Sequence, residues 1–167
     1  LAKLDVVIGS VHSAMGQSEA VMTERLLRAI GNPLLHVLGH PTGRLLLGRE
    51  GYRFDTKRLF DACRAHGVAI ELNANPHRLD LDETLLPEVV RRGIPIAIDP
   101  DAHDLRGIED VNYGVGAARR AGVPKSSVLT ALDVEEFRAW TRAKRGLPPP
   151  PPLVLPARSA PVGDADD

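Results

Sequence analysis

The 167-residue sequence predicts an α/β fold built on a parallel sheet. Short runs rich in Val, Ile and Leu alternate with segments whose apolar residues recur at helical spacing. The pattern repeats about every 30 residues, the length of one strand–helix unit with its connections. Such a repeat is typical of parallel strands, because each parallel connection needs room for a crossover helix.

Four segments are predicted as strands because they are short, apolar and bounded by Gly, Pro or Asn. The first lacks apolar–polar alternation, so we expect it to be covered on both faces. Four strands cannot close a barrel. Because Leu1 is not Met and strand-like residues follow closely, we expect half a barrel from a chain that begins inside a domain. In chain order the strands are expected at residues 5–10, 34–38, 68–72 and 94–98.

Helices are predicted between these strands from periodicity and from residues that begin or end a helix. Ser18 and Asp55 are expected to cap the first two helices, and Gly67 and Gly93 to stop the second and third. Pro87 falls late enough to loosen the first turns of the third helix. The helices are expected at residues 18–30, 55–66, 82–92, 111–121, 126–130 and 134–144.

The chain changes character after residue 145. Five consecutive prolines at 148–152 are followed by small residues, more proline and three aspartates. Such a segment cannot build a core. We therefore predict one domain at residues 1–145 and a flexible proline-rich tail at 146–167. A plain tail or linker is favoured over a peptide-docking role for the proline run.

Composition narrows the class of protein. Apolar residues make up 43% of the chain, and 21 basic against 22 acidic residues leave a formal net charge of −1. This balance argues against a surface that coats nucleic acid or membrane. Cys63 is the one cysteine, so no internal disulfide can form. No apolar run reaches the roughly 18 residues of a membrane span. We expect a cytoplasmic protein with no membrane partner.

Imidazole and carboxylate groups follow three of the predicted strands. Asp101 and His103 follow the fourth strand, while His12 and His40 follow the first two. Functional groups of parallel α/β folds gather at the carboxyl ends of the strands. These residue types are common ligands of zinc, manganese and iron. The sequence therefore predicts a metal site. For Asp101 and His103 the alternative is that the Asp caps the following helix and the His packs beside it.

Two loops are expected to contribute further side chains to this site. In residues 39–44 (Gly-His-Pro-Thr-Gly-Arg), Arg44 is expected to contact a phosphate, or else to pair with a nearby acid. In residues 71–78, Glu71 and Asn73 point the same way and are expected to hold histidine rings in one tautomer. Arg78 is a second candidate for the phosphate. A purely structural role for this second loop is equally well supported.

Other motifs carry less information about function. Residues 113–116 (Tyr-Gly-Val-Gly) lack the third glycine and the preceding strand of a dinucleotide site, so close helix packing is favoured. His36 lies within a predicted strand and is expected to be structural. His66 lies at the end of a helix, where a cation suits the helix dipole.

Taken in their order along the chain, these motifs resemble those of the PHP (polymerase and histidinol phosphatase) domain. Within that superfamily, the motifs look like the version fused to the carboxyl end of bacterial family X DNA polymerases. The resemblance covers residues 4–145. It rests on Ser-Val-His at 10–12, Gly-His-Pro-Thr-Gly-Arg at 39–44, Glu-Leu-Asn-Ala-Asn-Pro at 71–76, Asp-Ala-His at 101–103 and Tyr-Gly-Val-Gly at 113–116.

The resemblance implies a distorted (βα)7 barrel, of which this chain would be the carboxyl-terminal part. It implies a trinuclear Mn²⁺ or Zn²⁺ site, to which this chain would contribute His12, His40, Asp101 and His103. The family's opening His-x-His motif and other ligands would lie upstream and are not in this sequence. Pro100 and Ala117 also depart from the family pattern.

The activity implied is phosphoester hydrolysis. In a polymerase-fused member it would be a 3′–5′ exonuclease that processes DNA 3′ ends or abasic sites in DNA repair, with Asp101 and His103 catalytic. The partners would be DNA 3′ ends, the amino-terminal remainder of the barrel and a polymerase region. We expect the isolated chain to be inactive. The alternatives are a stand-alone phosphatase for a small phosphate monoester and a non-catalytic domain that stabilises its polymerase.

Overall fold

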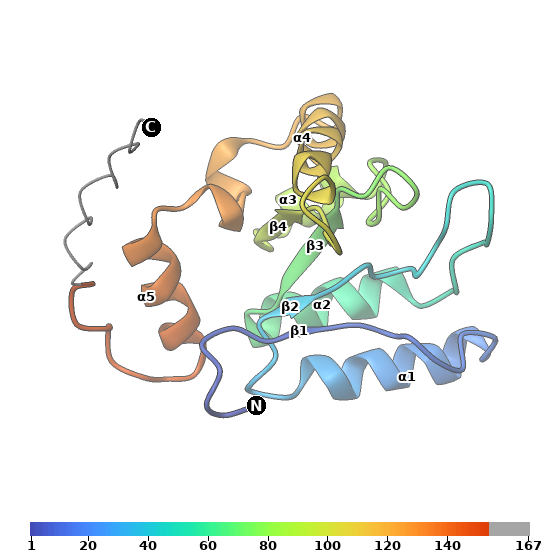
Figure 1. Cartoon of the computed structure of the whole chain (residues 1–167). Helices are drawn as coiled ribbons and strands as arrows, with labels where there is room; N and C mark the ends of the chain where they lie inside the picture. The colour runs from blue at the N-terminus through green and yellow to red at the C-terminus, as the bar shows by residue number, and fades with distance from the viewer. Residues whose placement is uncertain (154–167) are drawn as a thin grey trace, which may run out of the picture.

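The computed structural model describes residues 1–153 as an α/β structure with one parallel sheet (Figure 1). The strands are short: β1 (Ile8–Gly9), β2 (Val37–Leu38), β3 (Ala69–Asn73) and β4 (Ile96–Asp99). The α-helices are α1 (Glu19–Ile30), α2 (Thr56–His66), α3 (Leu86–Arg91), α4 (Val111–Arg120) and α5 (Val134–Lys144). Three 3₁₀ helices are η1 (Gly107–Asp110), η2 (Lys125–Ser127) and η3 (Leu129–Ala131).

The strands lie in the order β1-β2-β3-β4, and every neighbouring pair is parallel. Each strand therefore pairs with the strand before it in the chain, as in the wall of a barrel, whereas doubly wound sheets reverse their order at a switch point. Val128 forms a parallel bridge with Ile96 beyond β4, which extends the sheet slightly on that side. The fold class is confirmed as α/β, and the topology is compatible with part of a barrel.

The helices that follow β1 to β4 pack on one face of the sheet. Their buried side chains form a single core with the strand residues that point to this face, of which Ile70, Leu72 and Ile96 are fully buried. Helices α1 and α2 lie side by side (Figure 1). The helices that follow the strands of a barrel all lie on its outer face, whereas an open doubly wound sheet carries its crossover helices on both faces.

The other face of the sheet changes in character along the strands. Near the amino ends it carries small apolar residues, Val37, Ala69 and Ala97, and these pack against Trp140 of α5. Further along the strands, Glu71 and Asn73 lie two and four residues beyond Ala69, and Asp99 lies two beyond Ala97, so alternation brings all three to the same face. This face is therefore apolar at the amino ends of the strands and polar at their carboxyl ends.

Several predicted boundaries are confirmed by the local contacts that cause them. Ser18 accepts a hydrogen bond from the amide of Val21, and Asp55 accepts one from the amide of Arg58, so both cap their helices. Gly67 ends α2 with a φ of +61°, which a residue without a Cβ adopts at low cost.

Other boundaries differ from the prediction. The third helix begins at Leu86 instead of residue 82, because the Asp82 side chain binds the Thr84 amide in a turn and Pro87 stands in the first helical turn. The segment 126–130 is not an α-helix but lies in two short 3₁₀ helices. The first strand is two residues long, and the exposed side chain of Ile8 shows that it is not covered on both faces. β1 is an edge strand of the sheet within the described residues.

His36 links α5 to the sheet, and its structural role is confirmed. Its Nδ1 accepts a hydrogen bond from the Val7 amide at 3.2 Å, and Nε2 lies 3.2 Å from the carbonyl oxygen of Thr141. Because Nδ1 is an acceptor, Nε2 carries the proton and donates a hydrogen bond to the carbonyl oxygen of Thr141. Burial lowers the pKa of His36, and the charges of Arg145 and Lys144 lower it further.

We expect this histidine to make the fold sensitive to mild acid. Below the ordinary histidine pKa of about 6.5, the unfolded chain binds a proton at His36 that the folded chain does not, so the free energy of unfolding falls as pH falls. Urea unfolding between pH 7 and pH 5 should show this loss, and the slope should be smaller in His36→Gln. Parallel curves for the two proteins would contradict the assignment.

The segment that leads into the proline run lies along α5. Arg138 donates to the carbonyl oxygen of Pro151 at 3.1 Å, and Arg142 donates to that of Pro148 at 2.6 Å. The rest of the predicted tail, residues 154–167, lies outside the described residues. Among residues 1–153, no helix is long and apolar enough to cross a membrane.

Candidate functional site at the carboxyl ends of the strands

His12 and His40 are brought together at the carboxyl ends of β1 and β2. Their ring centroids lie 5.0 Å apart at an interplanar angle of 89°. His12 is exposed, and its Nε2 lies 2.7 Å from the Ser10 hydroxyl. His40 is buried, and its Nδ1 has no hydrogen-bond partner among the described residues. Burial and the charge of Arg78 lower the pKa of His40, which favours the neutral form that can bind a metal ion.

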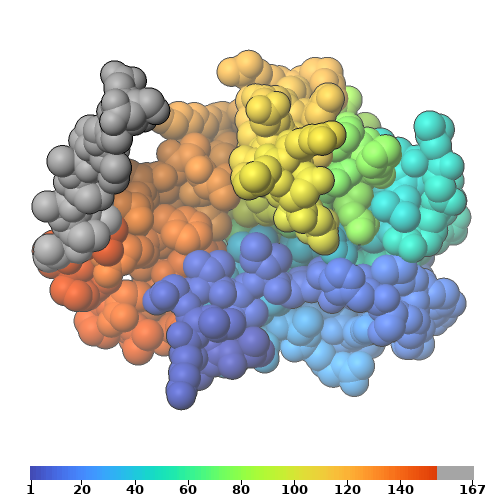
Figure 2. Space-filling view, in the orientation of Figure 1, coloured from blue at the N-terminus to red at the C-terminus, as the bar shows by residue number. Residues whose placement is uncertain are grey.

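Asp101 and His103 lie on the loop after β4. The Asp101 carboxylate accepts a hydrogen bond from the Asn73 amide group at 3.2 Å and lies 3.6 Å from Nε of Arg78. The negative charge of Asp101 opposes the lowering of the His40 pKa. His103 is exposed, and its Nδ1 lies 2.7 Å from the carbonyl oxygen of Asp101. Figure 2 shows this loop (yellow) at the surface, beside the green segment that follows β3.

Glu71 and Asn73 lie beneath these groups, as the alternation predicted, but neither contacts a ring nitrogen. Glu71 accepts a hydrogen bond from the backbone amide of His40, and Asn73 donates to Glu71 at 3.2 Å as well as to Asp101. The two residues therefore hold the loops that carry His40 and Asp101, and they act through backbone and carboxylate contacts rather than by setting a histidine tautomer.

Asp99 is a member of the site that the sequence interpretation missed. Its carboxyl group shares a hydrogen bond with that of Glu71, and it accepts one from the amide of Asp101. Burial and the charge of Asp99 raise the pKa of Glu71 to about 9, and burial raises that of Asp99. One of the two groups therefore keeps a proton at neutral pH. Strand alternation with Asp101 was the signal that could have revealed Asp99.

The two arginines differ in their surroundings. The Arg44 guanidinium forms an ion pair with Asp82 and donates to the carbonyl oxygens of Arg78 and Leu79. This is the ion-paired alternative that the sequence left open for Arg44. Arg78 lies beside Asp101, within the candidate site.

The donor set fits part of a metal site. The fit rests on two adjacent imidazoles, one of which has a buried nitrogen without a partner among the described residues. It also rests on the Asp101 carboxylate, which Asn73 and Glu71 link to the backbone of His40. Within residues 1–153, however, no three His, Cys, Asp or Glu side chains converge closely enough to hold an ion. A complete coordination sphere would need the loops to close further or donors from outside these residues.

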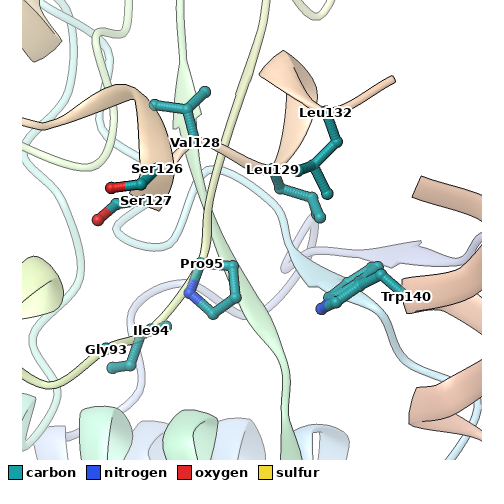
Figure 3. Close-up of a pocket in the computed structure, with 9 residues that line it drawn as sticks. All are labelled: Gly93, Ile94, Pro95, Ser126, Ser127, Val128, Leu129, Leu132 and Trp140. Carbon is teal, nitrogen blue, oxygen red and sulfur yellow. The ribbon is translucent and has the colours of Figure 1, made fainter. Parts of the chain in front are cut away.

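A separate cavity of about 250 Å³ lies at the opposite end of β4 (Figure 3). Pro95, which precedes β4, lies between Ser126 and Ser127 on one side and Trp140 on the other. None of the predicted metal, phosphate or supporting residues lines this cavity. It is therefore distinct from the candidate site.

The fold and the site define a parallel α/β protein with imidazole and carboxylate groups at the carboxyl ends of its strands, and comparison with known proteins supports a phosphoesterase-type domain. The chain is 38% identical over 142 residues to the DNA polymerase/3′-5′ exonuclease PolX of Bacillus subtilis. It is 27% identical over 154 residues to a probable phosphatase of Caldanaerobacter subterraneus, and 29% identical over 139 residues to one of Vibrio parahaemolyticus. No family model matches the chain.

These relatives are longer than the chain. The matches cover 85%, 87% and 76% of this sequence, but 25%, 58% and 52% of the three relatives in the same order. The chain therefore spans a quarter of the polymerase/exonuclease and between half and three fifths of the two phosphatases.

Proposed function

We propose that the chain is part of a PHP-type, metal-dependent phosphoesterase domain that hydrolyses DNA from its 3′ end. The observation that carries the proposal is the contact of His12 with His40 at the carboxyl ends of the strands, where the buried Nδ1 of His40 lacks a partner among the described residues. Asp101 is linked to the His40 backbone through Asn73 and Glu71. The similarity to a polymerase/3′-5′ exonuclease supports DNA as substrate. The parallel sheet, with the helices that follow its four strands on one face, fits a segment of a (βα)7 barrel.

In this proposal His12, His40, Asp101 and His103 are metal ligands, and further ligands come from residues outside this sequence. Bound Mn²⁺ or Zn²⁺ would supply Lewis-acid stabilisation of the phosphoryl oxygens and would lower the pKa of an attacking water. Arg78 lies beside Asp101 and would bind the phosphate, whereas Arg44 would hold the loop through Asp82. Glu71, Asn73 and Asp99 would keep the ligand loops in place.

A phosphatase for a small phosphate monoester is the second candidate. The similarity to the probable phosphatases favours it, because they are matched over a larger share of their length than the polymerase/exonuclease. A third possibility, a non-catalytic domain that supports a polymerase, would leave the site without metal.

One assay separates these candidates in the complete protein that carries this chain. The protein is incubated with end-labelled DNA and, separately, with p-nitrophenyl phosphate, in Mn²⁺, in Zn²⁺ and in EDTA. Shortening of DNA from the 3′ end that EDTA abolishes is the expected result. Monoester hydrolysis alone would favour the phosphatase. No hydrolysis of either substrate, together with no bound metal, would contradict the proposal and favour the non-catalytic domain.

A further inference from the structure

Asp80 is a fully buried carboxylate outside the residues assigned above to metal, phosphate or support. Its backbone pairs with that of Asn73 at the end of β3. Its side chain reaches the loop after β2 and accepts hydrogen bonds from the backbone amides of Thr42 at 3.1 Å and Gly43 at 2.8 Å. Asp80 therefore ties the end of β3 to the loop that follows His40.

This loop needs an outside partner because its own backbone is in an uncommon conformation. The φ angle is +26° at His40 and +64° at Gly43, and for a residue with a side chain a positive φ is costly. A Cβ at position 43 would lie 2.8 Å from Cε1 of Tyr52. The loop therefore packs closely against the Tyr52 ring and also binds the Asp80 carboxylate.

The charges around Asp80 fit a role in holding the loop. Both carboxylate oxygens lie within 3.2 Å of the Thr42 amide nitrogen. Burial raises the pKa of Asp80, while hydrogen bonds from Thr42 and the charge of Arg44 lower it. The oxygens are therefore directed at backbone donors of this loop. Such contacts fix geometry, because a buried acceptor and a buried amide each lose free energy when unpaired.

We propose that Asp80 is a second positioning residue for His40, in addition to Glu71, which binds the His40 amide. Asp80 fixes the turn at residues 40–43 so that the His40 imidazole stays against His12 and its Nδ1 remains available. The part of this inference that concerns metal affinity rests on the proposed function. The part that concerns the position of His40 rests on the loop alone, so the two can be tested separately.

The test is Asp80→Asn in the complete protein, which keeps the size of the side chain but replaces one acceptor oxygen with an amide donor. In metal-free NMR we expect faster amide exchange at Thr42 and Gly43 and shifted imidazole signals of His40. We also expect Mn²⁺ affinity to fall about 10- to 100-fold, the usual effect of losing a residue that orients a ligand. The charge-matched control is Asp61→Asn, an exposed position on α2, which should leave all three readouts unchanged.

A second pair of variants keeps the inference testable if Asp80→Asn does not fold. Thr42→Val removes a hydroxyl group that accepts a hydrogen bond from the Arg44 amide and helps to lower the pKa of Asp80, while Thr42→Ser keeps it. We expect shifted His40 signals and weaker Mn²⁺ binding in the valine variant alone. Unchanged His40 signals in folded Asp80→Asn, or equal behaviour of the two Thr42 variants, would overturn the inference. If Asp80→Asn shifts the His40 signals but the complete protein hydrolyses no phosphoester, the proposed function is contradicted and the role of Asp80 is still supported.

Discussion

Asp101→Asn and His40→Ala are each expected to lower Mn²⁺-dependent DNA hydrolysis by the complete protein at least about 100-fold. Asp101→Asn removes the negative charge that a metal ion needs while keeping the shape of the side chain. His40→Ala removes the imidazole whose Nδ1 is buried and has no partner within residues 1–153. The measurement is the initial rate of release of nucleotides from labelled DNA at saturating Mn²⁺. If the complete protein carries a polymerase activity, we expect that activity to survive.

His66→Ala is the matched control for the loss of an imidazole. His66 lies exposed at the end of α2, away from the residues of the candidate site. We expect His66→Ala to release nucleotides at the same rate as the wild-type protein. Thermal unfolding of each variant separates loss of a ligand from loss of the fold. Wild-type hydrolysis by folded Asp101→Asn or folded His40→Ala would remove that residue from the metal site.

Gly114→Ala is expected to lower the free energy of unfolding by about 2–3 kcal/mol, the upper part of the usual range for overpacking a core. A Cβ at position 114 would lie 2.6 Å from Cβ of Ala74, 2.8 Å from Cγ2 of Ile98 and 3.2 Å from Cα of Ala74. Because one of these atoms belongs to the backbone of the segment after β3, a side-chain rotation cannot relieve the contact. Helix α4 would have to move away from the sheet. Urea denaturation measures the loss.

Gly116→Ala, two residues further along the same helix, is the control. The nearest atom to a Cβ at this position is Nη1 of Arg120 at 3.7 Å, an ordinary contact. Alanine is the better helix former by about 0.5–1 kcal/mol, so this variant should be as stable as the wild type or slightly more stable. Equal destabilisation by the two substitutions would mean that α4 does not approach the sheet through Gly114.

Much of the fold could be predicted because local signals and packing agree. Asp55 and Gly67 bound α2 as expected, and the interpretation of the glycines at 114 and 116 as helix packing rather than a dinucleotide site is confirmed at Gly114. The length of β1 could not be predicted. The apolar sequence at residues 5–10 is the same whether or not another strand pairs with its outer edge, but only a paired segment forms a longer strand. The start of α3 was missed because the Asp82 turn competes with the helix for the same amides.

The site was predictable only in outline. The positions of His12, His40 and Asp101 just after predicted strands indicated where they lie, because the carboxyl ends of parallel strands meet at one edge of the sheet. The partners of each group were not predictable. Arg44 contacts Asp82, 38 positions along the chain, and Asp80 contacts Thr42 at the same separation. No local pattern encodes such contacts, since they depend on how two loops from neighbouring strands pack.

The central claim is that His12, His40, Asp101 and His103 bind a common group of metal ions. The most direct measurement is a crystal structure of the complete protein grown with Zn²⁺, with the ions located by anomalous scattering. We predict ions with each of the four side chains at a ligand distance of about 2.0–2.2 Å. Ions bound elsewhere, or none within reach of these side chains at saturating Zn²⁺, would contradict the claim.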